Sequence, residues 1–156
     1  GYAPQFLHGA QGQPSYLLSV ENLTTFNEIA AELAGPLAGV VIYTGGYASP
    51  SMLRAYLCLV DALPSSTPIY HWGDTDLHGF RIARQLAEAL QKKGRTLRLW
   101  MMGKYVDGCE QAPLSQRDQS LILEICRKWG WGEAGTIVAR VGQSLEQELQ
   151  PLLLPA

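Results

Sequence analysis

The sequence contains little cysteine, and its cysteines form no recognisable site. Its 156 residues include three: Cys58, Cys109 and Cys126. They are widely spaced, odd in number and without a C-x-x-C pair. This arrangement argues against a thiolate zinc site and against a disulfide framework. We therefore expect a protein of the reducing cytoplasm.

Long apolar runs and a large net charge are also missing. No run approaches the length that crosses a bilayer, and the N-terminus lacks a charged-then-apolar signal pattern, so no membrane partner is expected. Hydrophobic residues make up 47% and charged residues 17%, which at this length predicts one globular domain with its own core. The formal net charge of −2 gives no general indication of a nucleic-acid binder.

One segment departs from this balance. Between residues 81 and 104, a single acid, Glu88, stands among seven basic residues: Arg81, Arg84, Lys92, Lys93, Arg95, Arg98 and Lys104. Such a run is typical of a phosphate-facing surface or, more commonly, of a solvated helix face. The run alone does not distinguish the two.

Strand-like and helix-like patterns alternate along the chain. Apolar or β-branched runs predict strands at 15–20, 39–45, 68–72 and 96–102. Apolar residues at helical spacing predict helices over 21–35, 49–63, 80–94 and 115–129, with a further helix at 144–150. This alternation predicts an α/β fold, with a mainly parallel four-stranded sheet and helices on both faces. Residues 1–14 show little periodicity, and we interpret them as a linker from a missing N-terminal region.

Polar segments follow the predicted strands at one edge of this sheet. In parallel α/β folds, ligands bind at the carboxyl ends of the strands. The segments leaving the first three strands there are "SVEN", "YTGGYASP" and "HWGDTD". All three are polar or rich in glycine, and two carry carboxylates. Their shared position is the first indication of a site.

The loop "GDTDLHG" (73–79) allows several interpretations on its own. A calcium-binding EF-hand loop would need an oxygen ligand where His78 stands and a bidentate glutamate where Gln85 stands, and a strand-like segment precedes it. A phosphatase nucleophile loop normally follows the first strand rather than the third. A polar turn stays open, because Thr75 or Asp76 would cap the next helix.

Glu21 makes a metal site the favoured interpretation. It ends the first predicted strand, so that with Asp74 and Asp76 it places three carboxylates at neighbouring strand ends. Like charges repel one another in a cleft and are kept together mainly when a cation neutralises them. Oxygen ligands without cysteines or paired histidines favour Mg²⁺, with Mn²⁺ as the alternative, over zinc. Such an ion suits binding a phosphodiester.

These motifs resemble a known domain. "SVEN" after one strand, a glycine-bearing second loop and "GDTDLHG" after the third strand resemble the Toprim domain of type II topoisomerases, primases and related nucleases. "TGGYASPSMLR" resembles the glycine-rich loop of topoisomerase VI A subunits. "VENLTTF" with "YHWGDTDLHGFRIARQL" looks like the C-terminal domain of JetD, the nuclease subunit of Wadjet plasmid-defence systems. The similarity extends to "LEQE" (145–148) and implies a Toprim-like catalytic domain over residues 15–156.

The resemblance assigns the acidic residues their roles. It implies a metal-dependent DNA endonuclease in which Glu21, Asp74 and Asp76 are catalytic and hold one or two Mg²⁺ ions. In Toprim proteins the glutamate is also suggested to act as a general acid–base. Glu21 would alternatively cap the helix that follows, since a carboxylate suits a helix N-terminus. Asn22 is expected to orient Glu21 by hydrogen bonding.

Other residues near these loops are candidates for contacts to DNA. They are Gly45 and Gly46, whose backbone would approach a phosphate, together with His78 and Arg81. The simpler alternatives are a plain glycine turn, an exposed histidine and a solvated helix cation. His71 is expected to point into the sheet as a satisfied polar side chain.

The resemblance implies double-stranded DNA and an SMC-like condensin complex as partners, with a homodimer as a further prediction. The nucleophile stays open between water and a tyrosine of a missing domain, because nothing marks Tyr47 or Tyr105 for that role. We expect the fragment alone to cut DNA weakly or not at all. Two alternatives remain: a DNA-breaking subunit like topoisomerase VI A, and a non-catalytic module that docks DNA or a partner.

Overall fold

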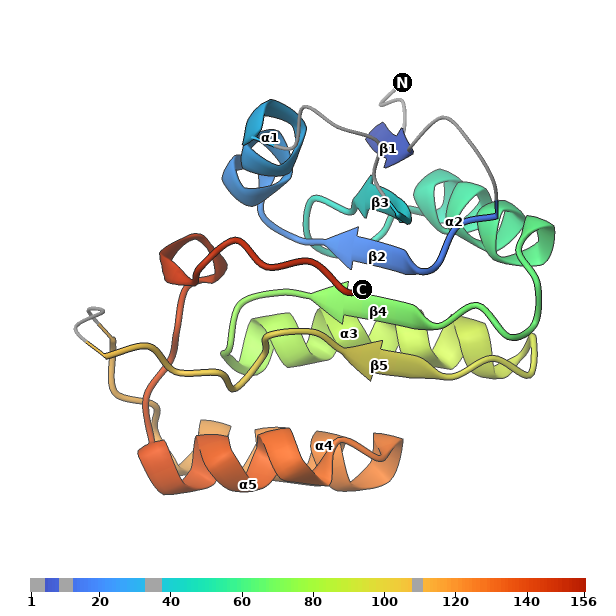
Figure 1. Cartoon of the computed structure of the whole chain (residues 1–156). Helices are drawn as coiled ribbons and strands as arrows, with labels where there is room; N and C mark the ends of the chain where they lie inside the picture. Colours follow the sequence, from blue (N-terminus) through green and yellow to red (C-terminus); the bar gives the residue numbers. More distant parts are fainter. Residues whose placement is uncertain (1–4, 9–12, 33–37, 108–110) are drawn as a thin grey trace.

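The fold is built on one sheet, in the strand order β1-β3-β2-β4-β5 (Figure 1). The computed structural model describes residues 5–8, 13–32, 38–107 and 111–156. Four neighbouring strands run parallel, which confirms the predicted α/β fold with a mainly parallel sheet. These strands are β2 (Leu17–Val20), β3 (Val40–Tyr43), β4 (Ile69–Trp72) and β5 (Leu97–Leu99).

The fifth strand, β1 (Gln5–His8), pairs antiparallel with the outer edge of β3. It lies in the segment that we expected to be a linker, so the sheet has one strand more than the four predicted. Four residues without a periodic pattern carry no strand signal of their own. The open edge of β3 supplies the pairing instead, and this tertiary context is invisible in a short window of sequence.

Helices cover both faces of the sheet, as predicted. On one face lie α2 and α3, with α4 packed against α3 and α5 packed against α4. On the other face lies α1, and the C-terminal Leu152 and Leu154 join its hydrophobic cluster. Trp131 Nε1 donates to the Leu97 carbonyl at 3.0 Å and so ties α5 to β5. The helices are α1 (Leu23–Glu32), α2 (Pro50–Ala62), α3 (Leu77–Gln91), α4 (Gln116–Trp129) and α5 (Gly132–Val141).

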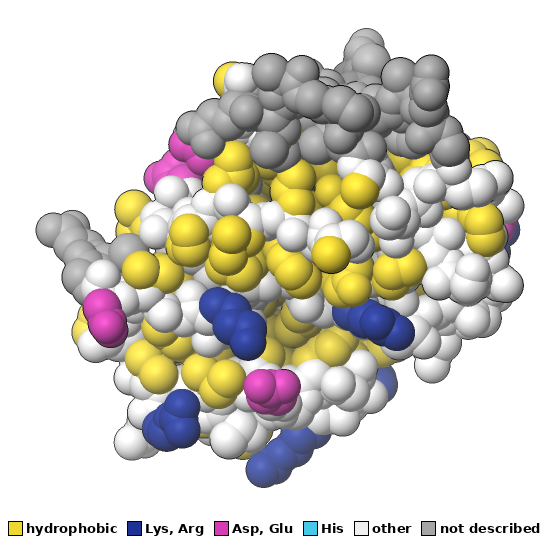
Figure 2. Space-filling model, in the orientation of Figure 1, with side chains coloured by type: hydrophobic (Ala, Val, Ile, Leu, Met, Phe, Trp, Pro, Cys, Tyr) yellow, Lys and Arg dark blue, Asp and Glu magenta, His cyan; other side chains and the backbone are white. Residues whose placement is uncertain are grey.

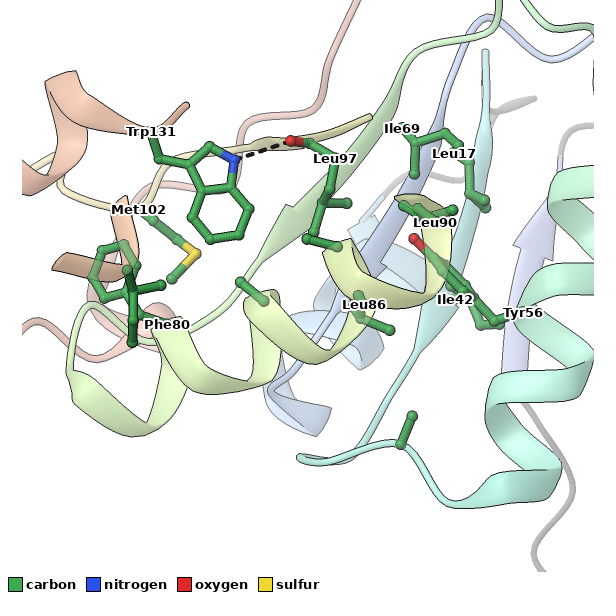
Figure 3. Packing of buried hydrophobic residues seen from close by; sticks show 14 of the residues in the cluster. Leu17, Ile42, Tyr56, Ile69, Phe80, Leu86, Leu90, Leu97, Met102 and Trp131 are labelled. Atoms are coloured by element: carbon green, nitrogen blue, oxygen red, sulfur yellow. Dashed lines mark hydrogen bonds between the residues drawn. The ribbon is translucent and has the colours of Figure 1, made fainter. Parts of the chain in front are cut away.

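Strands β2 and β3 contribute to two cores, because successive side chains point to opposite faces. Leu17 and Ile42 belong to the larger core beneath α2 and α3, whereas Leu18 and Val41 belong to the smaller core beneath α1. Burying one such side chain contributes about 1.5–3 kcal/mol to stability. Figure 3 shows how α3 fills the larger core with the large, fully buried side chains of Phe80, Leu86 and Leu90.

The end of the chain differs from the prediction. The prediction of a helix at 144–150 is wrong, because that segment forms only a 3₁₀ turn, η1 (Gln147–Leu149). Helix α5 directly follows α4 and was not predicted, since three glycines at 130, 132 and 135 obscure its pattern. The tail after η1 runs along one face of the sheet (Figure 1). Figure 2 shows this face, on which hydrophobic side chains form a broad band and Lys and Arg are few and scattered.

Two helix starts follow their sequence signals. Ser49 caps α2 by accepting from the Met52 N–H at 3.2 Å, and Ser115 caps α4 by accepting from the Asp118 N–H at 3.1 Å. Within the described ranges, none of the helices combines the length and apolar character needed to cross a membrane.

Candidate functional site

The strand order brings two acidic loops together. From β2 the chain passes through α1 to β3, and from β3 it returns through α2 across β2 to β4. The loops after β2 and β4 therefore flank the point where the winding direction changes, which is where parallel α/β sheets form a ligand-binding crevice. Val20 and Trp72 are register partners, so Glu21 and Asp74 leave the same edge of the sheet.

Glu21 is held in the crevice by two contacts. Its backbone N–H donates to the Trp72 carbonyl at 3.0 Å, and its Oε2 accepts from the Asp74 N–H at 3.1 Å. Burial and the negative charges of Asp74, Asp76 and Glu146 together raise the pKa of this carboxyl to about 7, against the lowering effect of the Asp74 hydrogen bond. Glu21 thus titrates close to neutral pH.

Asp74 and Asp76 each accept a hydrogen bond from a backbone N–H through Oδ1. Asp74 Oδ1 accepts from the Gln147 N–H at 2.7 Å, and burial raises the pKa of the Asp74 carboxyl. Asp76 is the N-cap of α3, with its Oδ1 accepting from the Gly79 N–H at 2.7 Å. The capping role that we considered for this loop is therefore real for Asp76. Thr75 is instead buried, and its Oγ1 accepts from the Gly103 N–H at 2.9 Å.

The three carboxylates are the type of ligand that a hard divalent cation prefers, although their side chains are not grouped around one cation position. Among the described residues, no three His, Cys, Asp or Glu side chains are grouped closely enough to hold a metal ion as they stand. Glu21 Oε1 and Asp76 Oδ2 nevertheless accept no hydrogen bond from the described part of the chain. Mutually repelling, half-buried carboxylates with spare oxygens are the ligand set that Mg²⁺ prefers.

Two glycines allow the acidic loop to pack this closely. A Cβ on Gly73 would collide with Glu21 Oε2 and would lie 2.9 Å from His71 Nε2. A Cβ on Gly79 would collide with the Asp74 backbone carbonyl. Neither glycine has a positive φ, so the requirement is for space rather than for backbone freedom.

The glycine-rich loop after β3 lies next to the acidic loop. Gly45 and Gly46 take positive φ values of 65° and 96°, which a residue with a Cβ rarely adopts. A cavity of about 230 Å³ opens beside Gly45, lined by Tyr43, Thr44, Gly45, Tyr47, Ser49 and Met52. The exposed Tyr47 ring meets the His78 ring edge-on, with 5.1 Å between centroids. His78 therefore contacts the glycine loop.

Arg81 is half-buried on the first turns of α3. It lines a cavity of about 200 Å³ together with Arg84 and Lys128, and Glu88 and Glu124 share that lining. The basic run of the sequence therefore does not form a purely cationic surface here. In the turn after α3, Lys93 pairs with Asp61 at 2.8 Å.

Two neighbours of the site behave differently from expectation. Asn22 does not orient Glu21: its Oδ1 caps α1 by accepting from the Thr25 N–H at 3.0 Å. His71 does point into the sheet and is fully buried, but it is only partly satisfied. Its Nδ1 lies 2.8 Å from Ser19 Oγ, while its Nε2 has no hydrogen-bond partner in the part of the chain that the structure describes. Burial lowers the pKa of His71 to about 3.

Sequence reasoning missed two residues of the crevice, Glu146 and Gln147. The Glu146 side chain hydrogen-bonds to that of Asp74, and Gln147 binds Asp74 through its backbone N–H. The motif "LEQE" carried them in the sequence, but we expected a helix there, which gave no reason to bring its carboxylates to the strand ends.

Comparisons with known proteins give one family match. A search of curated proteins finds no match. Among solved structures, YbtT, a type II thioesterase from the yersiniabactin NRPS/PKS biosynthetic pathway, aligns with a TM-score of 0.38 and 15% identity over 89% of this chain and 67% of that chain. Its S89A mutant gives a TM-score of 0.38 and 13% identity over 89% and 70%. These scores are too low to establish a common fold. The family model described as "Wadjet protein JetD, C-terminal" matches residues 3–119, and the chain therefore belongs to the JetD C-terminal family.

Proposed function

We propose that this chain is the Mg²⁺-dependent DNA endonuclease domain of a Wadjet-type plasmid-defence system. The observation that carries the proposal is the convergence of Glu21 and the Asp74–Asp76 loop at the switch point of the sheet, joined by the Asp74 N–H to Glu21 Oε2 bond. Family membership supports the defence context. The substrate is double-stranded DNA, and an SMC-like complex of the same system is the proposed partner, with a homodimer as the proposed assembly.

Glu21, Asp74 and Asp76 would hold the cation, which when bound neutralises charge on the scissile phosphate and on the leaving oxygen. Hydrogen bonds from backbone N–H groups fix the first two carboxylates, so they need little reorganisation during the reaction. Before a cation binds, Glu21 has a raised pKa of about 7, so this carboxyl exchanges its proton readily at neutral pH and can give it up to bind the cation.

The surrounding residues position DNA in this proposal. Gly45 and Gly46 expose backbone beside the crevice, His78 lies between the two loops, and Arg81 supplies a cation on the adjacent helix. These contacts would be to the phosphate backbone and so independent of sequence.

Water is the proposed nucleophile. The Tyr105 hydroxyl donates to the Gln143 carbonyl at 2.6 Å, and burial raises its pKa to about 12, which disfavours the tyrosinate needed for attack. Tyr47 lies on the glycine loop with its ring edge-on to His78, and that ring contact supplies no base to its hydroxyl.

The test is cutting of closed-circular plasmid by the protein together with its SMC-like partner complex, in Mg²⁺ or Mn²⁺. We expect Glu21→Ala and Asp74→Ala to abolish cutting, and the exposed Glu133→Ala on α5 to leave it unchanged. Undiminished cutting by either acidic variant would mean that the carboxylates are not catalytic. If the unmodified protein binds plasmid but never cuts it, the chain is instead a docking module.

A further inference from the structure

The tail segment 143–150 returns to the acidic crevice and is fastened there. Thr75 and Leu145 form an antiparallel bridge with backbone hydrogen bonds of 2.9 and 3.2 Å. The Gln147 N–H binds Asp74, and Gln150 Oε1 accepts from Trp72 Nε1 at 2.8 Å. The family match ends at residue 119, so it says nothing about this segment.

This fastening fixes Glu146 beside Asp74. Glu146 stands between a residue bridged to Thr75 and a residue bonded to Asp74, so its backbone has little freedom to move away. Its side chain hydrogen-bonds to the Asp74 carboxyl, and its charge acts on Glu21. Two carboxylates in direct contact need a shared proton or a cation between them.

Two residues next to these carboxylates each have a buried polar atom with no hydrogen-bond partner in the described part of the chain. Gln147 is fully buried, and its Oε1 accepts from the Asn22 N–H at 2.9 Å, whereas its Nε2 has no partner among the described residues. His71 Nε2 is likewise buried and has no partner among the described residues. A Cβ placed on Gly73 would lie 2.9 Å from this nitrogen and would also collide with Glu21 Oε2, so both atoms border the same small space. Buried polar atoms are rarely left unpaired, so we infer that these two atoms hydrogen-bond to oxygen atoms of a ligand or of its waters in the crevice.

We propose that Glu146 is a fourth carboxylate ligand and gives the crevice the capacity for a second divalent cation. This inference rests on the proposed function. With Glu21, Asp74 and Asp76, Glu146 brings four negative charges to one crevice, which two divalent cations neutralise. Paired cations are a common way to stabilise both the attacking and the leaving oxygen in phosphodiester cleavage.

The experiment counts the Mn²⁺ ions bound by the purified, metal-free protein, using isothermal titration calorimetry. We expect two ions for the unmodified chain, one for Glu146→Gln and two for Glu133→Gln, which removes an exposed glutamate in the first turn of α5. Circular dichroism checks that each variant is folded. As Glu146 is exposed, the amide is expected to leave the fold intact.

The outcomes separate this inference from the proposed function. The same number of ions in Glu146→Gln as in the unmodified chain overturns the role of Glu146 but leaves the catalytic site in place. A single ion in the unmodified chain overturns the second site. Failure of the unmodified chain to bind any Mn²⁺ overturns the proposed function itself.

Discussion

Glu21 Oε2 accepts a hydrogen bond from the Asp74 backbone N–H at 3.1 Å, so the two halves of the acidic crevice are in direct contact. This bond needs an acceptor oxygen but no negative charge. Replacing the carboxylate by an amide therefore separates the structural role of Glu21 from its chemical role.

The variant Glu21→Gln should keep the fold and lose the metal response. Without metal at pH 8, its thermal midpoint should lie above that of the unmodified protein, because a half-buried charge is removed. Because the pKa of Glu21 is raised in the fold, the unmodified protein gains stability as pH falls through about 7 toward the ordinary carboxyl value. The difference between the thermal midpoints of the two proteins should therefore shrink by pH 5. Mn²⁺ should raise the midpoint of the unmodified protein only. An equal Mn²⁺-induced rise in both would rule out Glu21 as a ligand.

Metal binding should release a proton near neutral pH. Since the pKa of Glu21 is raised to about 7, the carboxyl must lose its proton to bind a cation, and the affinity for Mg²⁺ should increase as pH rises through that value. Calorimetry in buffers of different ionisation enthalpy should report about one proton released at pH 6 and close to none at pH 8. Proton release that does not change over this range would contradict the assignment.

Gly79→Ala should destabilise the acidic loop, because the new Cβ would collide with the Asp74 carbonyl. We expect a loss of about 1–3 kcal/mol in the free energy of unfolding, the usual cost of inserting a methyl group into a packed site. Urea denaturation measures it. Gly132→Ala is the matched control: its Cβ would meet nothing within 4 Å, and alanine in a helix is favoured by up to about 1 kcal/mol. If Gly79→Ala and Gly132→Ala had the same free energy of unfolding, the acidic loop would have room to accommodate the new methyl group.

The buried His71 should make the protein less stable in acid. Its pKa is lowered to about 3 in the fold, so the neutral form stabilises the folded state above the ordinary histidine pKa, and this is lost as pH falls from 6.5 toward 3. The limiting slope from one such group is about 1.4 kcal/mol per pH unit. We expect the free energy of unfolding to fall less steeply between pH 6.5 and 4 in His71→Asn. If the free energy of unfolding fell equally steeply with pH in both proteins, the group that titrates would not be His71.

Arg81→Gln should weaken DNA binding at all sequences alike. Removing one phosphate contact should lower the slope of log affinity against log salt by about one. Fluorescence anisotropy with labelled duplex DNA measures both quantities. Lys93→Gln, in the turn that follows the same helix and paired with Asp61, should leave the slope unchanged. Identical slopes for all three proteins would remove Arg81 from the DNA-contacting surface.

Local patterns predicted most of what lies between residues 15 and 129. The four parallel strands and the helices between them have strong periodicity, and Ser49 and Ser115 mark two helix starts. The order of the strands placed Glu21 and Asp74 at one edge, because parallel topology leaves few alternatives. In these cases local preference and tertiary packing agree.

The rest depends on contacts that no local pattern reveals. Strand β1 exists because β3 has an open edge. The segment around Glu146 has the polar and apolar spacing of a helix, yet its residues are extended or in a 3₁₀ turn because Gln147 and Gln150 find partners near β4. Asn22 caps a helix instead of orienting its neighbour, a choice between two short-range hydrogen bonds that the sequence does not settle.

The bond between Gln147 and Asp74 spans 73 residues of chain. On a ribosome that adds about 5–20 residues per second, roughly 4–15 s pass between the synthesis of these two residues. If Glu146 is a ligand as proposed, a nascent chain holds three carboxylates of the crevice but not the fourth. The crevice would then be complete only after residue 147 has been made and has docked against Asp74, so that metal binding would be a late event in folding.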